Sequence, residues 1–456
     1  MKKTQTALVV LVFSAALAAA QAAPASSDTS TQPAPQTSTP AASDNSTNAS
    51  PQPAAPAAAT TPAAPATSSA APAQTSAPSS AVAAQPDMSK AESAHYIVYS
   101  QLGVDRAADL SSRLEALFTL FGGVFHFDAA TLPAKLNVRE FKDKAGFDSY
   151  LNQAAGQTKD DFVYLRFPTV ERSELLLFVK DGPDAEASLA HQAFVQYLKS
   201  FMKNPPLWMI DGFAVYFESA AWDASSKSLN FPENMAWLET AKALQSKNGL
   251  LPMARFLTMS QDDSRSSLDV FYPESWAFVS FLMSSKDKTY SRLLWDSIAA
   301  LRKDGSLEEN QEAIGNAIAT WYGVEAVQTA FLSYLGGRKT FAEFLADGVA
   351  AYNAKTLDVA RAAFESAAKM DATSYVPSYY LGLIAYNAGD YGLAEYDYRT
   401  ALKLGCDPAA ANYALGVNAF AQNRTDDAKS FLLAAKAASP DRYGAKADEL
   451  LKRLGM

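Results

Sequence analysis

Cysteine and histidine are scarce in this sequence of 456 residues, which contains one cysteine and three histidines. The lone Cys406 excludes an intramolecular disulfide. His95 and His126 have no neighbour at metal-ligand spacing, and a lone histidine is usually structural. A G-x-S-x-G nucleophile elbow and a glycine-rich phosphate loop are also absent. These absences leave serine hydrolase, cysteine hydrolase and nucleotide-binding classes without support.

Basic runs are missing as well. The chain has 39 Lys and Arg residues against 48 Asp and Glu residues, a formal net charge of −9. A protein that binds nucleic acid or an anionic membrane surface concentrates positive charge on one patch or stripe. We therefore expect neither kind of partner.

One hydrophobic run stands at the start of the sequence, from Ala7 to Ala20. It follows Lys2 and Lys3 and ends in an A-x-A pattern, which predicts a signal peptide over residues 1–22 with cleavage after Ala22. The run is shorter than the ~20 residues that span a bilayer. No cysteine follows the cleavage site, so a lipidated N-terminal cysteine is excluded. We expect a soluble exported protein, periplasmic or otherwise extracytoplasmic.

Residues 23–91 consist mostly of Ala, Pro, Ser, Thr and Gln. A segment with few charges and few large apolar residues cannot bury enough surface to offset the entropy of ordering. We expect a disordered, partly extended tether. A plain spacer is the simplest interpretation, and a cell-wall-spanning or adhesive role is the alternative.

Most of the polar residues that suggest a function lie within residues 189–218, where the apolar spacing predicts two consecutive helices. His191 lies on a largely apolar stripe of the first helix. Asn204-Pro205-Pro206 ends that helix, because proline favours a turn or the first position of a new helix. Asp211 and Glu218 are the acidic residues of the second helix.

The second helix reads W-M-I-D-G-F-A-V-Y-F-E over residues 208–218. It resembles the W-x-x-E-G-x-A-x-Y-x-E motif of the peptidase-MA-like gluzincin metallopeptidases, in which a helix carrying H-E-x-x-H comes first. The matching residues are Trp208, Gly212, Ala214, Tyr216 and Glu218. The resemblance covers residues 92–335 and implies a strand-rich part before the two helices.

The first motif departs from that family pattern. His191 occupies the first histidine position, Gln192 the position of the glutamate base and Val195 that of the second histidine. Asp211 replaces the glutamate that the resemblance makes the third zinc ligand. An amide cannot take a proton from zinc-bound water, and two ligands remain of three. We expect a degenerate site with no catalytic residue, no metal and no cofactor, and hence a protein that is not an enzyme.

A zinc-dependent metallopeptidase with a rebuilt site is the alternative. His191 and Asp211 would then bind zinc, and Glu218 offers a further carboxylate on the same helical face. His95 or His126 would complete the site if the fold brought either of them next to His191.

Strands alternate with helices before this helix pair. Period-2 and apolar runs predict strands at His95–Ser100, Leu136–Phe141, Phe162–Phe167 and Glu174–Val179. We expect a small mixed sheet packed on the helix pair, and thus an α+β domain. The resemblance places residues 175–179 beside the substrate cleft, where an edge strand could pair with an extended peptide. The continuous apolarity of residues 175–179 instead favours a position in the interior of the sheet.

The segment after Glu218 is predicted to be mainly helical. The expected helices cover residues 233–247, 252–259, 273–282, 293–301, 309–322 and 324–335. Their Trp and Phe residues are expected to form core. These helices complete the first domain.

A period of 34 residues runs through the last part of the chain. It is carried by five columns, namely Gly348, Gly382, Gly416; Tyr352, Tyr386, Phe420; Ala360, Ala394, Ala428; Phe364, Tyr398, Leu432; and Ala367, Ala401, Ala435. The pattern resembles three tetratricopeptide repeats over residues 345–456, each a pair of antiparallel helices, with a capping helix over residues 445–454. The resulting all-α domain is expected to bind a protein or an extended peptide in its groove, or to brace the first domain.

Six polar residues of the repeats are candidates for that groove or its edge: Tyr375, Tyr379, Tyr380, Asn387, Tyr391 and Tyr396. Tyrosine at a repeat position is more often core than ligand contact. The sequence as a whole predicts an exported, non-catalytic protein-binding scaffold. A structural envelope component without a defined ligand is a further interpretation.

Overall fold

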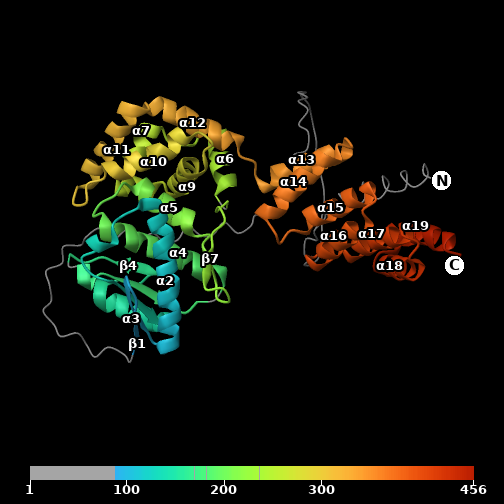
Figure 1. Ribbon diagram of the computed structural model, residues 1–456, viewed down its shortest axis with the longest axis horizontal. Helices are drawn as coiled ribbons and strands as arrows, with labels where there is room; N and C mark the ends of the chain where they lie inside the picture. Colours follow the sequence, from blue (N-terminus) through green and yellow to red (C-terminus); the bar gives the residue numbers. More distant parts are fainter. Residues whose placement is uncertain (1–87, 169, 181, 236, 456) are drawn as a thin grey trace, which may run out of the picture. The chain divides into compact units, whose positions relative to one another are not determined.

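A computed structural model of the chain describes residues 88–168, 170–180, 182–235 and 237–455 (Figure 1). The predicted signal peptide and almost all of the predicted tether lie outside the described residues. The last residues of the predicted tether, 89–91, belong to strand β1 (Ser89–Glu92) and are therefore ordered, contrary to the prediction. The described residues form two units, 88–338 and 339–455. No helix within the described ranges is long and apolar enough to cross a membrane.

The first unit is built on a mixed sheet of five strands in the order β1-β2-β3-β5-β4. The strands β2 (Tyr96–Ser100), β3 (Leu136–Phe141) and β5 (Glu174–Phe178) are parallel, while β1 and β4 (Val163–Leu165) pair antiparallel at the two edges. The predicted α+β class is therefore confirmed.

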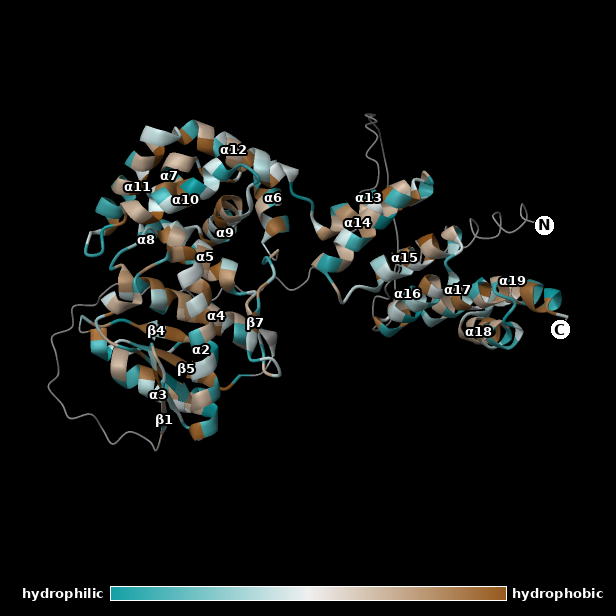
Figure 2. Ribbon diagram, in the orientation of Figure 1, coloured by the Kyte–Doolittle hydropathy of each residue, from teal (hydrophilic) through white to brown (hydrophobic). Residues whose placement is uncertain are grey.

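Strand β5 lies inside the sheet, with β3 on one side and β4 on the other. Its five residues are all buried, as expected of a strand covered on both faces. The prediction of an edge strand at residues 175–179 was wrong, and the alternative drawn from its apolarity is confirmed. The edge next to β5 is formed by β4, which is only three residues long. Figure 2 shows the hydrophobic residues that gather on these strands.

Helices cover both faces of the sheet (Figure 1). Helix α3 (Lys144–Ala155) packs on β3 and β5, where the Phe147 ring lies 5.0 Å from the Phe178 ring. Helices α2 (Val104–Phe125) and α4 (Pro183–Phe201) contact the other face and each other. An aromatic cluster joins them to α5 (Leu207–Phe217), with Phe121 4.8 Å from Phe217 between ring centroids. Ring pairs at such distances add to the burial of apolar area that stabilises the core.

The remainder of the first unit contains a hairpin and seven helices within its described residues. They are β6 (Ala221–Asp223), β7 (Ser228–Asn230), α6 (Leu238–Ser246), α7 (Met253–Leu257), α8 (Gln261–Ser266), α9 (Leu268–Ser284), α10 (Lys288–Ala300), α11 (Leu307–Trp321) and α12 (Val324–Gly337). Three predicted helix starts were wrong. The helix expected from residue 233 begins at Leu238. The helices expected from residues 273 and 293 begin earlier, at Leu268 and Lys288.

The second unit contains three helix pairs and a final helix. The pairs are α13 (Phe341–Asn353) with α14 (Leu357–Met370), α15 (Tyr375–Ala388) with α16 (Tyr391–Lys403), and α17 (Pro408–Ala421) with α18 (Thr425–Ala438). The final helix, α19 (Pro440–Arg453), starts earlier than the predicted cap at residues 445–454. The helix pairs confirm the predicted helical period.

A close glycine contact recurs in each of these pairs. A Cβ atom on Gly348 would lie 2.8 Å from the Phe364 ring, and one on Gly382 would lie 2.6 Å from the Tyr398 ring. At Gly416 the equivalent distance to Leu432 is 2.8 Å. Each glycine thus lets the first helix of a pair approach the large side chain of the second.

Candidate functional site

The candidate site lies where α4 meets α5. Helix α4 begins after Gly182, whose φ of 94° favours glycine, and a proline occupies its first turn. Gly212 on α5 faces α9, where an added Cβ would lie 2.6 Å from the backbone oxygen of Ser275. Only glycine permits this approach, so α5 packs closely on α9 at the residue after Asp211.

His191 is buried in this site, with 2% of its surface exposed. Its Nδ1 lies 2.8 Å from Oε1 of Glu218, the residue that ends α5. Burial lowers the pKa of His191, but the hydrogen bond and charge of Glu218 outweigh that effect and raise the pKa above its usual value. The structure therefore brings together two of the predicted site residues, with Nδ1 of the histidine occupied.

Asp211 lies in the same site without a hydrogen bond to His191. Desolvation raises the pKa of Asp211 to about 6, against the opposing attraction of His191 and Lys199. The hydroxyl of Tyr272 on α9 is buried and has no hydrogen-bond partner among the described residues. Burial raises the pKa of Tyr272, and the charges of Asp211 and Glu218 raise it further. A buried hydroxyl without a partner is unfavourable unless water or a ligand group satisfies it.

Gln192 and Val195 face the accessible side of α4. The backbone N–H of Tyr164, on edge strand β4, donates to Oε1 of Gln192 over 3.3 Å. Gln192 thus ties the edge strand to the helix, and a peptide that paired with β4 would have to displace it. Val195 is partly exposed and brings no ligand atom to the site.

Lys199 is the site residue that the sequence argument missed. Its side chain is partly exposed and lies within the electrostatic reach of Asp211. Burial lowers the pKa of Lys199, and the positive charge of Arg166 lowers it further. The spacing contained a usable signal, because Lys199 follows Gln192 by seven residues and two helical turns return a side chain to nearly the same face.

The other two histidines lie elsewhere in the unit. Nδ1 of His95 lies 2.7 Å from Oε2 of Glu115, and its ring stacks on Phe118 with centroids 3.9 Å apart. His126 follows α2 with a φ of 50° and stacks on Trp295. Neither contact involves His191, so these observations do not support a metal site rebuilt from His95 or His126.

Whether the site could hold zinc depends on the number of protein ligands it offers. Structural and catalytic zinc sites use at least three protein ligands at about 2.0–2.3 Å. Within the described ranges, no three His, Cys, Asp or Glu side chains are arranged to hold a metal ion. His191 and Asp211 remain as donors, and Glu218 is engaged by Nδ1 of His191. The donor set does not fit the zinc site that the family resemblance implies.

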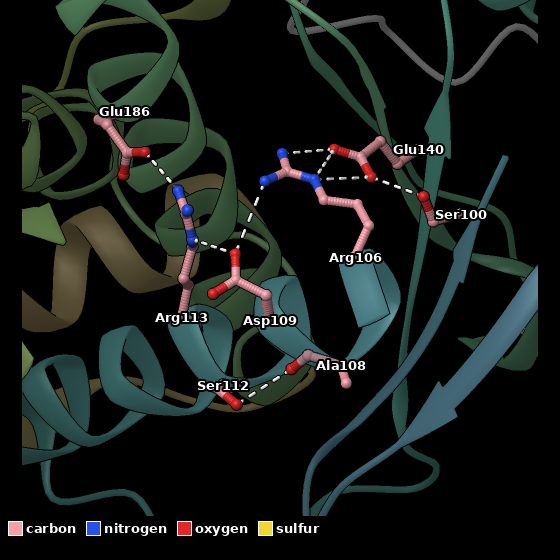
Figure 3. A network of polar contacts seen from close by, with 8 residues as sticks. All are labelled: Ser100, Arg106, Ala108, Asp109, Ser112, Arg113, Glu140 and Glu186. Carbon is pink, nitrogen blue, oxygen red and sulfur yellow. Dashed lines mark hydrogen bonds and ion pairs between the residues drawn. The ribbon is translucent and has the colours of Figure 1, made fainter. Parts of the chain in front are cut away.

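A second cluster of polar side chains lies at the carboxyl ends of the parallel strands, beside the N-terminal turns of α2 and α4 (Figure 3). Glu140 accepts hydrogen bonds from Ser100 and from Arg106, whose Nη2 lies 2.6 Å from its Oε1. Nη1 of Arg113 lies 2.5 Å from Oε1 of Glu186. These ion pairs line a pocket of about 50 Å³. Because each arginine already has a carboxylate partner, the pocket is a poor candidate for a charged ligand.

The candidate groove residues of the repeats differ in exposure. Tyr379 and Tyr380 are buried, whereas 66% of Tyr396 is exposed. Asn387 donates to the Tyr352 hydroxyl over 2.7 Å and to the Leu383 carbonyl. Tyr396 and Asn387 are thus the exposed candidates.

No model of a known protein family matches the chain, and a search of curated proteins finds no match. The resemblances to gluzincin peptidases and to tetratricopeptide repeats therefore depend on the motifs and contacts described above. Function has to be argued from the site itself.

Proposed function

We propose that this protein is an exported, non-catalytic scaffold that binds another protein or an extended peptide. It combines a degenerate metallopeptidase-like domain with a tetratricopeptide-like helical array. The observation that carries the proposal is the environment of Gln192, whose side-chain oxygen accepts the Tyr164 N–H of an edge strand. Gln192 occupies the position at which a peptidase of the resembled family has its general base, and here its side chain has a structural role.

The neighbouring residues support the same conclusion. Val195 has no metal-binding atom, and Glu218 holds Nδ1 of His191. Asp211 and Glu218 are carboxylates, but a hydrolytic site also needs a base placed against an activated water. The site retains polar groups that recognise a ligand and lacks the set that would cleave it.

The repeat unit supports binding through a different feature. The first and second helices of its pairs recur with the same packing contact, so the array presents a regular, extended surface. Four large apolar side chains on its second helices are exposed, namely Val359, Leu393, Tyr396 and Leu433. Helical arrays of this kind are well suited to hold an extended segment of another chain.

The first test measures zinc and peptidase activity in the full chain. We expect the purified protein to contain no stoichiometric zinc and to show no zinc-dependent cleavage of a peptide library. Gln192→Glu combined with Val195→His restores the two histidines at i and i+4 and serves as the matched positive control. Stoichiometric zinc in the unaltered protein, lost in His191→Ala, would refute the non-catalytic proposal.

The second test addresses binding. A displayed library of extended peptides is selected on the immobilised full chain, and amide hydrogen exchange locates the peptide that is enriched. We expect protection to appear in residues 339–455 or along α4 and β4. Failure to enrich any sequence over a denatured control would count against a peptide-binding scaffold.

A zinc-dependent metallopeptidase with an unorthodox site is the second candidate, and one contact favours it. Metal-binding histidines commonly donate their other ring N–H to a carboxylate, as His191 does to Glu218. That contact leaves Nε2 as the only ligand atom of His191. Activity of the unaltered protein that is lost in both His191→Ala and Asp211→Asn would establish this candidate.

A further inference from the structure

The pocket beside the ion pairs of Figure 3 has an apolar interior and a charged rim. Leu110, Leu177 and Leu189 line its interior, and each of them is at most 5% exposed. The pocket volume of about 50 Å³ exceeds the ~10–15 Å³ that one water molecule needs. It is far below the ~300–1,000 Å³ of sites that bind small molecules. A pocket of this size and lining suits one small apolar side chain.

The charged rim of the pocket is neutralised within the protein. Its three cations, Arg106, Arg113 and Lys180, lie 2.6, 2.5 and 2.8 Å from a carboxylate oxygen. A charged occupant would lose its hydration in the pocket and gain little from cations that are already paired. The occupant that fits best is therefore uncharged.

The first strand, β1, begins at the same edge of the sheet as this pocket. The register pairs Ser89 with Ser100, Ser100 with Glu140 and Glu140 with Leu177. Glu140 and Leu177 line the pocket, so Ser89 lies in the same row of the sheet, three strands away. Neighbouring strands are about 4.8 Å apart, which puts Ser89 roughly 14 Å from Leu177. The chain that precedes Ser89 therefore enters the sheet at the edge that holds the pocket.

Apolar side chains are exposed along this edge. Leu102 and Val104 lie just after β2, Val179 lies just after β5, and each is at least 40% exposed. Among the described residues of the first unit, five large apolar side chains are exposed, and these are three of them. Val179 also lines the pocket. A segment that crossed from Ser89 to the pocket would remove part of this apolar area from water.

The sequence just before Ser89 contains one side chain of the required kind. Val82 is the only Val, Leu, Ile, Met or aromatic residue in residues 23–87, and residues 79–86 carry no charge. Val82 precedes Ser89 by seven residues, and an extended chain of that length spans up to about 24 Å, more than the distance to the pocket. We propose that Val82 binds in this pocket, so that the protein's own N-terminal segment is its occupant. The inference goes beyond the proposed function, because it concerns a contact within the protein.

The intramolecular nature of this contact makes a weak interaction sufficient. A group held on a short flexible linker has an effective concentration in the millimolar range. Burial of the valine side chain favours the bound state about tenfold over an alternative residue that gains nothing from the pocket. Substitution of Val82 should therefore release the segment.

Methyl NMR of the full chain with labelled Val and Leu methyl groups tests the contact directly. We expect the Val82 methyl groups to show nuclear Overhauser contacts to Leu177 or Leu189. Their chemical shifts should also be displaced by the ring of Phe162, which lines the pocket. The Val82 resonances are assigned by their loss in Val82→Ala. Random-coil shifts for Val82, without contacts to the pocket leucines, would overturn the proposal.

Val82→Ser tests the contact from the side of the segment. We expect it to shift the methyl resonances of Leu177, Val179 and Leu189, because the pocket loses its occupant. Ala73→Ser makes a similar change elsewhere in the segment and should leave those resonances in place. Pocket resonances that are the same in Val82→Ser and the unaltered protein would refute the contact.

Ala185→Leu tests the contact from the side of the pocket, which Ala185 lines from α4. Ala187→Leu adds the same side chain on the same helix at a position outside the pocket lining and is the matched control. A protease that cleaves after small apolar residues reports on the accessibility of residues 81–85. We expect cleavage there to be about tenfold faster in Ala185→Leu and nearly unchanged in Ala187→Leu. Equal rates in all three proteins would contradict the proposal, and circular dichroism verifies that each variant is folded.

Sedimentation separates the protein's own segment from that of a second copy. A monomer that shows the Val82 contacts supports the intramolecular arrangement. A dimer that dissociates in Val82→Ser would assign the pocket to the segment of a second copy and would overturn it. The library selection for peptides gives the same result whether or not Val82 binds in the pocket, so the scaffold and this contact can fail separately.

Discussion

The two units of this protein achieve their packing by different means. Residues 88–338 combine a sheet whose neighbours are far apart in sequence with a core of aromatic rings and buried polar side chains. Residues 339–455 repeat one helix pair, and each pair uses the same glycine-to-large-residue contact. Non-local packing couples distant residues, whereas a repeat array couples mainly neighbours. A single substitution should therefore spread its effect in the first unit and stay local in the second.

The largest expected effect comes from Gly212→Ala. Its Cβ would lie 2.6 Å from a backbone oxygen and 2.8 Å from Val279 Cγ2, so α5 and α9 must separate. We expect the first unit to lose about 3 kcal/mol of unfolding free energy, measured by denaturant unfolding. Gly315→Ala is the matched control, because no heavy atom lies within 4 Å of its added Cβ. That control should gain about 0.5–1 kcal/mol from helix propensity.

Glu274→Gln should increase stability in a way that depends on pH. Burial raises the pKa of Glu274 to about 8, and only the Leu251 N–H opposes this among the described residues. In the unfolded chain the group ionises near 4.5, so wild-type stability is fully present below that pH and falls as pH rises toward 8.

The Glu274→Gln variant does not lose stability as the pH rises from 4.5 to 8, because glutamine does not ionise. Its advantage over the wild type should be near zero at pH 4.5 and reach about 2–4 kcal/mol at pH 8. Urea unfolding at the two pH values measures the difference. An advantage that does not change with pH would contradict a neutral, buried Glu274.

Gly382→Ala tests the repeat unit. The added Cβ would meet the Tyr398 ring at 2.6 Å, and a ring can shift more readily than a backbone. We expect a loss of about 1–2 kcal/mol, with faster amide exchange confined to α15, α16 and their neighbours. Gly392→Ala, whose nearest neighbour would lie at 3.8 Å, serves as the control. Faster amide exchange throughout α4 and α5 would contradict the expectation that the effect of Gly382→Ala stays local.

Gln192→Leu should have the smallest effect. It removes the acceptor of the Tyr164 N–H on β4, at a cost of about 1 kcal/mol. Exchange of the Tyr164 amide should become about fivefold faster, while Gln192→Glu, which keeps an acceptor oxygen, should leave it nearly unchanged. Equal rates in the leucine variant and the wild type would show that Gln192 does not hold the edge strand.

Local patterns in the sequence predicted the elements of both units well. The run of Leu136–Phe141 is a strand with those bounds, and the glycine column at 348, 382 and 416 marks the recurrent helix contact. Helix starts were predicted less well. The start of α9 before Pro273 could not be read from a rule that places proline at a helix beginning.

The site was predicted only in part. The sequence pointed to His191, Asp211 and Glu218, and the structure joins the first to the third. The attachment of Gln192 to Tyr164 depends on the approach of β4 to α4. That approach follows from the order of strands in the sheet, which residue spacing does not encode.

By itself the sequence determined the helical period of the second unit and the H-Q-x-x-V segment of the first, because both are written in residues close along the chain. Tertiary structure alone decided that β5 lies inside the sheet, that β4 forms one of its edges and that His191 meets Glu218. The physical reason is that burial and charge environment arise from contacts between segments far apart in sequence, and the desolvation of a group depends on all of them together.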